Sequence, residues 1–320
     1  MATNNATSIP ADGGRAGGNS GLVKFNRISA PSNFLFSALF VALALVCVIP
    51  LVFVAIISLS SDLSVQTVGY SFTPIEWTTN AYTYLFQSGD SITRAFFVSV
   101  GVTIVGTIIG LSLNASMGYV LSRPSFKLKK LYTTIIFIPM LFTGGMVASY
   151  MVNSQLLGLI NSYWALILPI SCSPFYIIIL RTFFQTTVPD SIIESARIDG
   201  ASQLFTFFRI VLPISKPALA TIGLFLSFAY WNDWFLAMLY LKSDHQFMYP
   251  LQYVLIRIEQ NIDFLVSNTQ YFSATMSGGR IPAESSRMAL VVIVVLPIAC
   301  SYPFFQKYFI SGLTIGAVKG

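Results

Sequence analysis

Residues 28–61 read ISAPSNFLFSALFVALALVCVIPLVFVAIISLSS and contain no ionisable side chain. A helix of about 20 apolar residues crosses the ~30 Å hydrocarbon layer of a bilayer. The run is too long for the apolar core of a cleaved signal peptide, which has about 7–15 residues. Backbone groups in lipid must be satisfied internally, so the run is expected to be helical. It predicts a membrane-spanning helix near 34–60.

Similar runs follow along the chain. Asp, Glu, Lys, Arg and His are absent from 95–122, 131–180, 217–232 and 288–306. The longest of these runs is divided by polar and Gly residues at 153–162, so two spans are expected there. We predict an all-α polytopic membrane protein with six spans, near 34–60, 95–121, 131–152, 163–182, 218–241 and 288–309.

The composition supports this class. Hydrophobic residues make up 55% of the 320 positions and charged residues only 9%, against about 25% charged in soluble domains. Disordered chains have low hydrophobicity and high charge, and a soluble enzyme needs a more charged surface. Three cysteines, without metal-ligand spacing, exclude a disulfide scaffold and predict no metal site.

The Lys and Arg residues orient the spans. With the N-terminus in the cytoplasm, thirteen of the 18 fall on the cytoplasmic side, and Arg94, Lys242, Arg257, Arg280 and Arg287 fall outside. This bias satisfies the positive-inside rule, with both termini cytoplasmic. Residues 1–33, rich in Gly, Ser, Asn and Ala, are expected to be a flexible cytoplasmic tail before a transmembrane domain at 34–320. The basic charge is expected to anchor this topology, and no nucleic-acid module is visible.

The cytoplasmic segment at about 188–217 predicts two short helices. Asp190 or Ser191 follows Pro189 as a helix cap, and Glu194 lies in the first turn. Gly200 is a natural stop or bend, and a second short helix with apolar residues such as Phe205 follows. Exposed apolar residues here need a partner. Lipid headgroups and a cytoplasmic protein are both candidates.

Polar residues inside two predicted spans are candidates for a substrate pathway. The fifth span carries Tyr230-Trp231-Asn232-Asp233-Trp234, and the second span carries Asn114. An intramembrane carboxylate is costly and suggests a polar cavity. Asn232 and Asp233 suit sugar hydroxyls, and Tyr230 and Trp234, at i and i+4 on one helix face, suit the apolar faces of a sugar ring. The alternative is that these residues bond and pack against other helices.

The outer segment at about 242–286 is long and mixes polar residues with aromatics. Two interpretations stay open: a simple solvated connection, or a surface for another protein.

One pattern in the cytoplasmic segment resembles a known signature. Glu194-Ser195-Ala196, three residues, Gly200, nine residues, Ile210, one residue and Leu212-Pro213 match the EAA signature of bacterial ABC-importer permeases. Ser195 replaces the middle Ala, a change of one small residue for another. The ending at 302–320, the fifth-span cluster and the span count resemble the carbohydrate-uptake branch, close to the maltose-type second permease and the LplC and YtcP group. The resemblance covers about 34–320.

The resemblance implies that the EAA segment is a coupling helix docked in a groove of a cytoplasmic ATPase. The residues that it assigns to this contact are Glu194, Ser195, Ala196, Ile198, Asp199, Gly200 and Phe205. Ala196 and Gly200 would allow close approach, while Ile198 and Phe205 would fill an apolar pocket. Transport would then proceed by alternating access, driven from the ATPase.

The resemblance also implies the partners: a second, different permease chain, two ATPase subunits, an extracytoplasmic solute-binding protein, membrane lipid and a sugar or oligosaccharide. The sequence contains no G-x-x-x-x-G-K-[ST] motif, so ATP and Mg²⁺ are expected on the ATPases and no catalytic residue on this chain. The expected location is the bacterial plasma membrane, with multiple spans. The alternatives are an importer permease for a non-sugar solute and, further off, a secondary transporter or channel.

Overall fold

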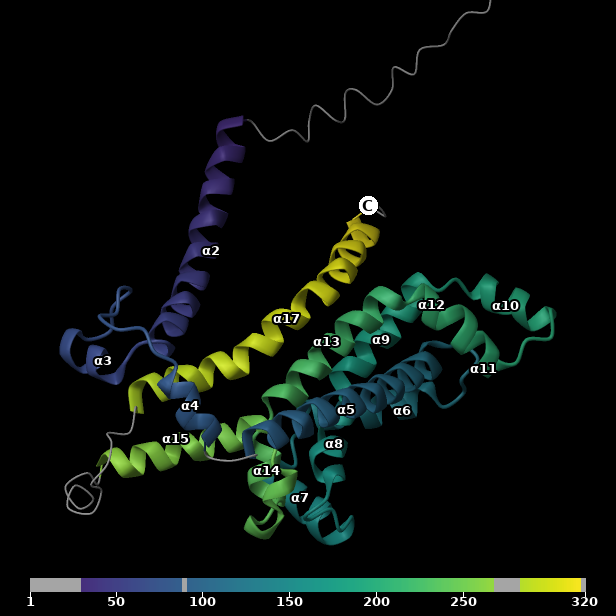
Figure 1. The fold of residues 1–320 in the computed structure, drawn as a ribbon. Helices are drawn as coiled ribbons and strands as arrows, with labels where there is room; N and C mark the ends of the chain where they lie inside the picture. The colour runs from purple at the N-terminus through teal and green to yellow at the C-terminus, as the bar shows by residue number, and fades with distance from the viewer. Residues whose placement is uncertain (1–29, 88–90, 268–282, 318–320) are drawn as a thin grey trace, which may run out of the picture. The chain divides into compact units, whose positions relative to one another are not determined.

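The computed structural model describes residues 30–87, 91–267 and 283–317. These residues are mostly helical, and their only β pairing is an isolated antiparallel bridge between Ser60 and Trp77. In chain order the described elements are α2 (Ala30–Ser58), α3 (Asp62–Val68), α4 (Asn80–Gln87), α5 (Ser91–Ser122), α6 (Lys129–Leu141), α7 (Gly145–Met151), η1 (Val152–Leu156), α8 (Tyr163–Ser171), α9 (Pro174–Thr187), α10 (Asp190–Ile198), α11 (Gln203–Thr206), η2 (Phe207–Val211), α12 (Leu212–Ile214), α13 (Lys216–Asn232), α14 (Phe235–Tyr240), η3 (Ser243–Met248), α15 (Leu251–Ser267) and α17 (Ala283–Ala317) (Figure 1).

Several helices have the length and composition of membrane spans. Within the described residues, three single helices are long and apolar enough to cross a membrane, at 31–58, 91–122 and 284–301. Three bent pairs qualify jointly: α6 with α7–η1, α8 with α9, and 203–214 with α13, so up to six spans are possible. The prediction of a helical membrane protein is confirmed. The bends within 129–156 and 163–187 are new, since the sequence predicted one continuous helix across each of these two regions. The bend before α13 agrees with the predicted short helix that precedes the fifth span.

The chain forms two units, residues 1–53 and 54–320. In the first unit the structure describes α2 from Ala30 onward, whose apolar side chains, such as Phe34 and Phe40, are exposed. Exposed apolar side chains along a helix of this length are expected to face lipid.

Helix α5 is the centre of the second unit, packed against α8, α9 and α13. Gly106 and Gly110 lie four positions apart on α5, and Gly118 lies eight positions further on the same side of the helix, a spacing that lets helix backbones approach closely. A Cβ on Gly106 would lie 2.5 Å from Cζ of Tyr230, and one on Gly118 would lie 3.0 Å from Cβ of Leu180. The absent side chains therefore set how closely α9 and α13 approach α5.

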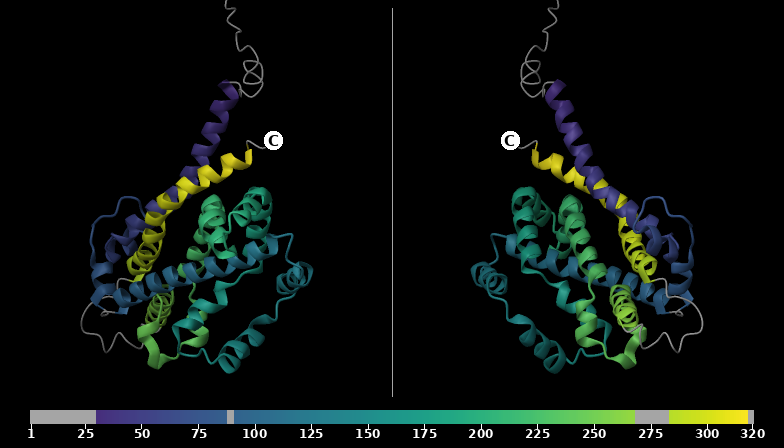
Figure 2. Two further views of the ribbon diagram at one scale, coloured as in Figure 1. Left: turned by 90° about the vertical axis from the view of Figure 1, so that its right-hand side faces the viewer. Right: turned by 90° about the vertical axis from the view of Figure 1, so that its left-hand side faces the viewer.

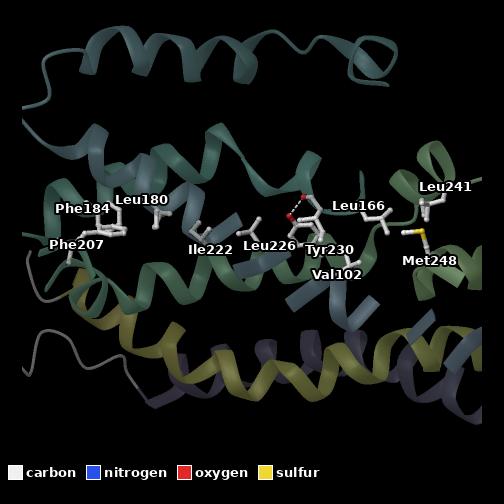
Figure 3. Close-up of a cluster of buried hydrophobic side chains, with 14 of the residues drawn as sticks. Val102, Leu166, Leu180, Phe184, Phe207, Ile222, Leu226, Tyr230, Leu241 and Met248 are labelled. Atoms are coloured by element: carbon white, nitrogen blue, oxygen red, sulfur yellow. Dashed lines mark hydrogen bonds between the residues drawn. The ribbon is translucent and has the colours of Figure 1, made fainter. Parts of the chain in front are cut away.

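The buried cluster of the second unit follows these contacts. Leu180 and Phe184 of α9 and Leu226 of α13 are each fully buried, and Phe207 of η2 joins them (Figure 3). The cluster runs from the segment around η2 to the region of Leu241 and Met248. A second cluster joins α4, α5, α15 and α17 through residues such as Leu85 and Leu255.

The segment α10–α12 lies at one end of α9 and α13, and α7 and α14 lie at the other end (Figure 2). At the end of α5 opposite the α10–α12 segment, contacts join residues far apart in sequence. Ser285 Oγ of α17 donates to the Ser60 carbonyl at 2.8 Å, and Tyr70 Oη donates to Glu284 at 2.7 Å. The start of α17 is therefore tied to the segment that follows α2.

The segment at 242–286 departs from a simple solvated connection. Its described part contains η3 and the amphipathic helix α15, and α15 packs on α5 and α17. Leu251, Leu255 and Ile262 of α15 are buried. Residues 268–282 of this segment, and the tail at 1–29, lie outside the described residues.

Candidate functional site

The segment predicted to couple the chain to an ATPase folds as two short helices around Gly200. α10 ends at Ile198, and the Ala201 amide donates to the Ala196 carbonyl at 2.9 Å. Gly200 has φ +84°, in the left-handed region that costs glycine little. Ser202 then caps α11 by accepting a hydrogen bond from the Phe205 amide. The helix–Gly–helix prediction for this segment agrees with the structure.

Apolar side chains gather on the outer surface of this segment. Ile198 is 86% exposed, Leu204 71% and Phe205 53%. Glu194, Ser195 and Asp199 are exposed beside them. Ala196 is buried, so it permits packing of α10 on its own chain rather than close approach by another protein. A Cβ added to Gly200 would meet no atom within 4 Å. Glycine is therefore favoured at this position by the left-handed backbone and not by a lack of space.

Arg123, at the end of α5, holds the start of α10. Its Nη1 lies 3.0 Å from Oδ1 of Asp190, its Nη2 donates to the Phe184 carbonyl at 3.4 Å, and its guanidinium lies over the Tyr119 ring. The prediction that Asp190 or Ser191 caps α10 is wrong, because Pro189 occupies the cap position and Asp190 is the first helical residue. The Asp190 carboxylate pairs with a residue 67 positions earlier in the chain.

Sequence reasoning missed Arg123 as a functional residue. The sequence showed Arg123 only as a positive charge directly after a long apolar run. That charge helped to predict which side of the membrane the loop lies on, and no contact was predicted for it. A cavity of about 430 Å³ lies between the end of α5 and the α10–α11 segment, lined by Tyr119, Arg123, Ile193, Arg197 and Thr206 among others. Arg123 thus links α10 to α9 through polar contacts, and Ile193 of α10 packs beside them on the buried cluster.

The polar cluster of the fifth predicted span lies at a helix break. α13 ends at Asn232, and α14 begins at Phe235. Asp233 has an extended backbone, is half-buried, and accepts a hydrogen bond from the Leu236 amide at 3.3 Å. Asn232 and Trp234 are exposed. Irregular backbone at membrane depth is tolerated where it is buried in protein or lines a cavity.

This break corrects the predicted arrangement of the aromatic pair. Tyr230 and Trp234 do not share a helix face, because the helix ends between them. Tyr230 is buried over Gly106, and its hydroxyl donates to the Ile167 carbonyl at 2.8 Å (Figure 3). Trp231 is also buried, and its Nε1 donates to the Val294 carbonyl of α17. Both side chains have packing partners inside this chain.

Asn114 is fully buried and joins α5 to the break between α8 and α9. Its Nδ2 donates to the carbonyls of Gly110 and Ser171, at 2.6 and 2.8 Å. Its Oδ1 accepts from the Ser173 amide at 3.0 Å. The side chain therefore satisfies backbone groups that the α8–α9 break leaves without helical partners. Its contacts are those of a helix-packing residue.

Among the described residues, no group of three His, Cys, Asp or Glu side chains is placed to hold a metal ion. Cys47, Cys172 and Cys300 are unpaired and exposed.

The long and bent apolar helices define a class: a helical protein that crosses a membrane several times. The chain belongs to the family described as "Binding-protein-dependent transport system inner membrane component", which matches residues 106–315. The resemblance to importer permeases is therefore confirmed at the level of the family, whose members are membrane components of transport systems.

Curated relatives and a solved structure agree. The chain is 40% identical over 278 residues to the polygalacturonan/rhamnogalacturonan transport system permease protein YtcP of Bacillus subtilis, covering 87% of this chain and 94% of the relative. It is 36% identical over 297 residues to the protein LplC of the same organism, covering 93% and 97%. A bacterial ABC transporter involved in import of the acidic polysaccharide alginate contains a chain with a TM-score of 0.74 and 28% identity, covering 87% of this chain and 96% of that one.

Proposed function

We propose that this chain is a transmembrane permease subunit of an ATP-driven importer for a sugar or oligosaccharide. The observation that carries the proposal is the exposed apolar surface of the α10–α11 segment, formed by Ile198, Leu204 and Phe205. Such a surface is unfavourable in water unless another protein covers it. The polysaccharides transported by the relatives YtcP and the alginate importer support a carbohydrate cargo.

In this proposal α10 is the coupling helix. An ATPase subunit covers Ile198 and Phe205, and the exposed Glu194, Ser195 and Asp199 form the polar rim of the contact. Arg123 contacts both Asp190 of α10 and the Phe184 carbonyl of α9. Movement of the ATPase is therefore transmitted from α10 to α5 and α9, which alternates access from one side of the membrane to the other. ATP and Mg²⁺ act on the ATPase subunits.

We further propose six spans, with both termini and the α10–α12 segment in the cytoplasm. The bent pairs supply the additional spans, and the excess of Lys and Arg on the α10 side supports the orientation. A second permease chain would cover the exposed apolar side chains around α7, such as Phe142, Met146 and Val147. A solute-binding protein would dock on the opposite side of the membrane from α10.

For the substrate pathway we propose Asn232, Asp233 and Trp234. The break between α13 and α14 leaves Asn232 and Trp234 exposed, and Asp233 has one carboxylate oxygen engaged by the Leu236 amide. Polar groups at a break in an apolar helix suit sugar hydroxyls, and the Trp234 ring suits an apolar sugar face. Tyr230, Trp231 and Asn114 support this site through packing.

The coupling role is tested with two variants of the exposed surface. Ile198→Asp introduces a charge where an apolar contact is proposed, and Gly200→Val forces a β-branched residue into a left-handed turn. We expect loss of ATPase copurification in mild detergent and loss of binding-protein-dependent uptake, while the permease stays in the membrane. Lys127→Asp, an exposed charge change outside the segment, is the matched control.

Uptake and ATPase assembly equal to the unsubstituted protein in both variants would contradict the proposal. Transport by the purified chain alone in vesicles, without an ATPase, would favour a secondary transporter or channel instead.

A further inference from the structure

Three cations converge where α5, α6 and α9 meet. Arg123 directly follows α5, Lys129 begins α6, and Arg181 lies on α9, and these three helices pack on one another (Figure 1). The positive charges of Arg181 and Arg123 act on the half-buried Lys129, and the negative charge of Asp190 opposes them in part. In the described residues the one carboxylate in ion-pair contact with the trio is Asp190, which pairs with Arg123. The cluster thus carries an uncompensated positive charge.

Arg181 shows the deficit most directly. Its Nε atom is buried and has no hydrogen-bond acceptor, although the residue as a whole is only partly buried. A buried donor without an acceptor is costly, more so when the group is charged. The buried Nε is not reached from outside the chain, but Arg181 is only partly buried, so the rest of its guanidinium can donate hydrogen bonds to an anionic oxygen ligand such as a phosphate.

An apolar surface lies beside the cluster. Leu128, directly before α6, and Leu131, Ile135 and Ile138 of α6 are each about half exposed and recur at helical spacing as an exposed stripe. Other apolar side chains of α6, such as Tyr132 and Met140, are exposed as well, whereas Ile136 packs inward against Leu121 and Ile177. Cations at the start of a helix and an apolar stripe along it match the two parts of a phospholipid, a charged headgroup and an acyl chain.

We propose that Arg181 and Lys129 bind the phosphate of an anionic phospholipid, with an acyl chain along the exposed stripe of α6. The assignment to the cytoplasmic leaflet rests on the proposed orientation, whereas binding itself does not. Juxtamembrane Lys and Arg attract anionic lipids. Arg123 keeps Asp190 as its partner, so the site lies directly beside the contact that holds α10.

The test uses the assembled importer, purified in mild detergent and stripped of lipid. Native mass spectrometry follows the binding of phosphatidylglycerol and of phosphatidylcholine. We expect phosphatidylglycerol to bind more tightly, and Arg181→Gln or Lys129→Gln each to weaken it about fivefold, the effect of one charge near an anionic lipid. Arg181→Lys should retain most of the binding. Lys127→Gln, an exposed charge removed from the same loop, is the matched control and should leave binding unchanged.

Equal binding of the two lipids, or equal loss in Lys127→Gln and Arg181→Gln, would overturn the proposal. A second arm adds excess glycerol phosphate. Retention of phosphatidylglycerol supports a lipid site, and displacement would assign the cluster to a soluble phosphate ester instead. If Arg181→Gln lowers the yield of complex, Lys129→Gln decides the question. An intact complex with ATPase but without lipid preference refutes this inference and leaves the proposed function standing.

Discussion

Gly106 determines the distance between α5 and α13. The Tyr230 ring occupies the space that a Cβ at position 106 would need, at 2.5 Å from Cζ. An aromatic ring fixed by a hydrogen bond from its hydroxyl to the Ile167 carbonyl has little freedom to retreat. The pair shows how one absent side chain sets the position of a whole helix.

We expect Gly106→Ala to destabilise the protein by about 1–3 kcal/mol, the usual range for overpacking. The melting temperature of the purified protein in detergent measures the effect. Gly101→Ala, on the same helix and with nothing within 4 Å of the added methyl group, should not lower it. Adding Tyr230→Leu to Gly106→Ala should recover part of the loss. Equal stability of the two alanine variants would show that α13 moves freely.

Asp62 illustrates a different residue-scale effect, outside the spans. Burial raises the pKa of its carboxyl above the ordinary 3.8, and hydrogen bonds from the Glu284 backbone and the Gln66 side chain offset this rise only in part. The folded protein therefore binds this proton more tightly than the unfolded chain. The resulting stabilisation is fully present below the unfolded pKa and is lost as pH rises through the folded pKa.

Asp62→Asn is accordingly expected to raise the melting temperature at neutral pH, because it removes a poorly solvated charge. The difference from the unsubstituted protein should shrink as pH falls toward 3.8. Melting curves across this pH range check the sign. A variant that is less stable at neutral pH would show that the ionised carboxylate is needed there.

At the scale of elements, charge-free runs predicted α2, α5 and α17 well, because a membrane helix is specified by composition alone. They did not predict the breaks at 142–144, 172–173 and 233–234. Those breaks depend on partners from other helices, such as Asn114, which satisfies Ser171 and Ser173. The two helices around Gly200 were predicted because their signals lie close together in the sequence. The contact of Asp190 with Arg123 was not predicted, because it joins residues 67 positions apart.

Helix α15 was missed for another reason. Its polar residues indicated a loop, although its buried Leu251, Leu255 and Ile262 follow helical spacing. The helices α3 and α4 were not predicted, because they are too short and too polar to resemble membrane spans. The spacing of Gly106, Gly110 and Gly118 was visible in the sequence and would have identified the packing face of α5.

We expect Leu255→Ala to destabilise the packing of α15 on α5 and α17 by about 2–5 kcal/mol, the range for a buried leucine. Gln260→Ala, exposed on the same helix, should have little effect. Thermal unfolding in detergent compares the two. Equal melting temperatures would indicate that α15 contributes little to the stability of the second unit.

At the scale of the whole molecule, the proposed orientation makes opposite predictions for two surface positions. In a variant whose native cysteines are replaced by serine, Gln203→Cys of α11 should be protected from a membrane-impermeant thiol reagent in intact cells. Gln246→Cys of η3 should react. Both positions are exposed in the structure, so accessibility depends on the side of the membrane. Labelling of Cys at position 203 in intact cells, with protection at 246, would invert the topology.

The bond from Ser285 to the Ser60 carbonyl joins residues 225 positions apart. During synthesis the earlier residue leaves the ribosome long before its partner is made. The Ser60 carbonyl can therefore accept this hydrogen bond only after Ser285 has been synthesised, late in translation. Membrane insertion of the early spans and closure of this contact are thus separate events, and a chain cut short before α17 would never achieve the second.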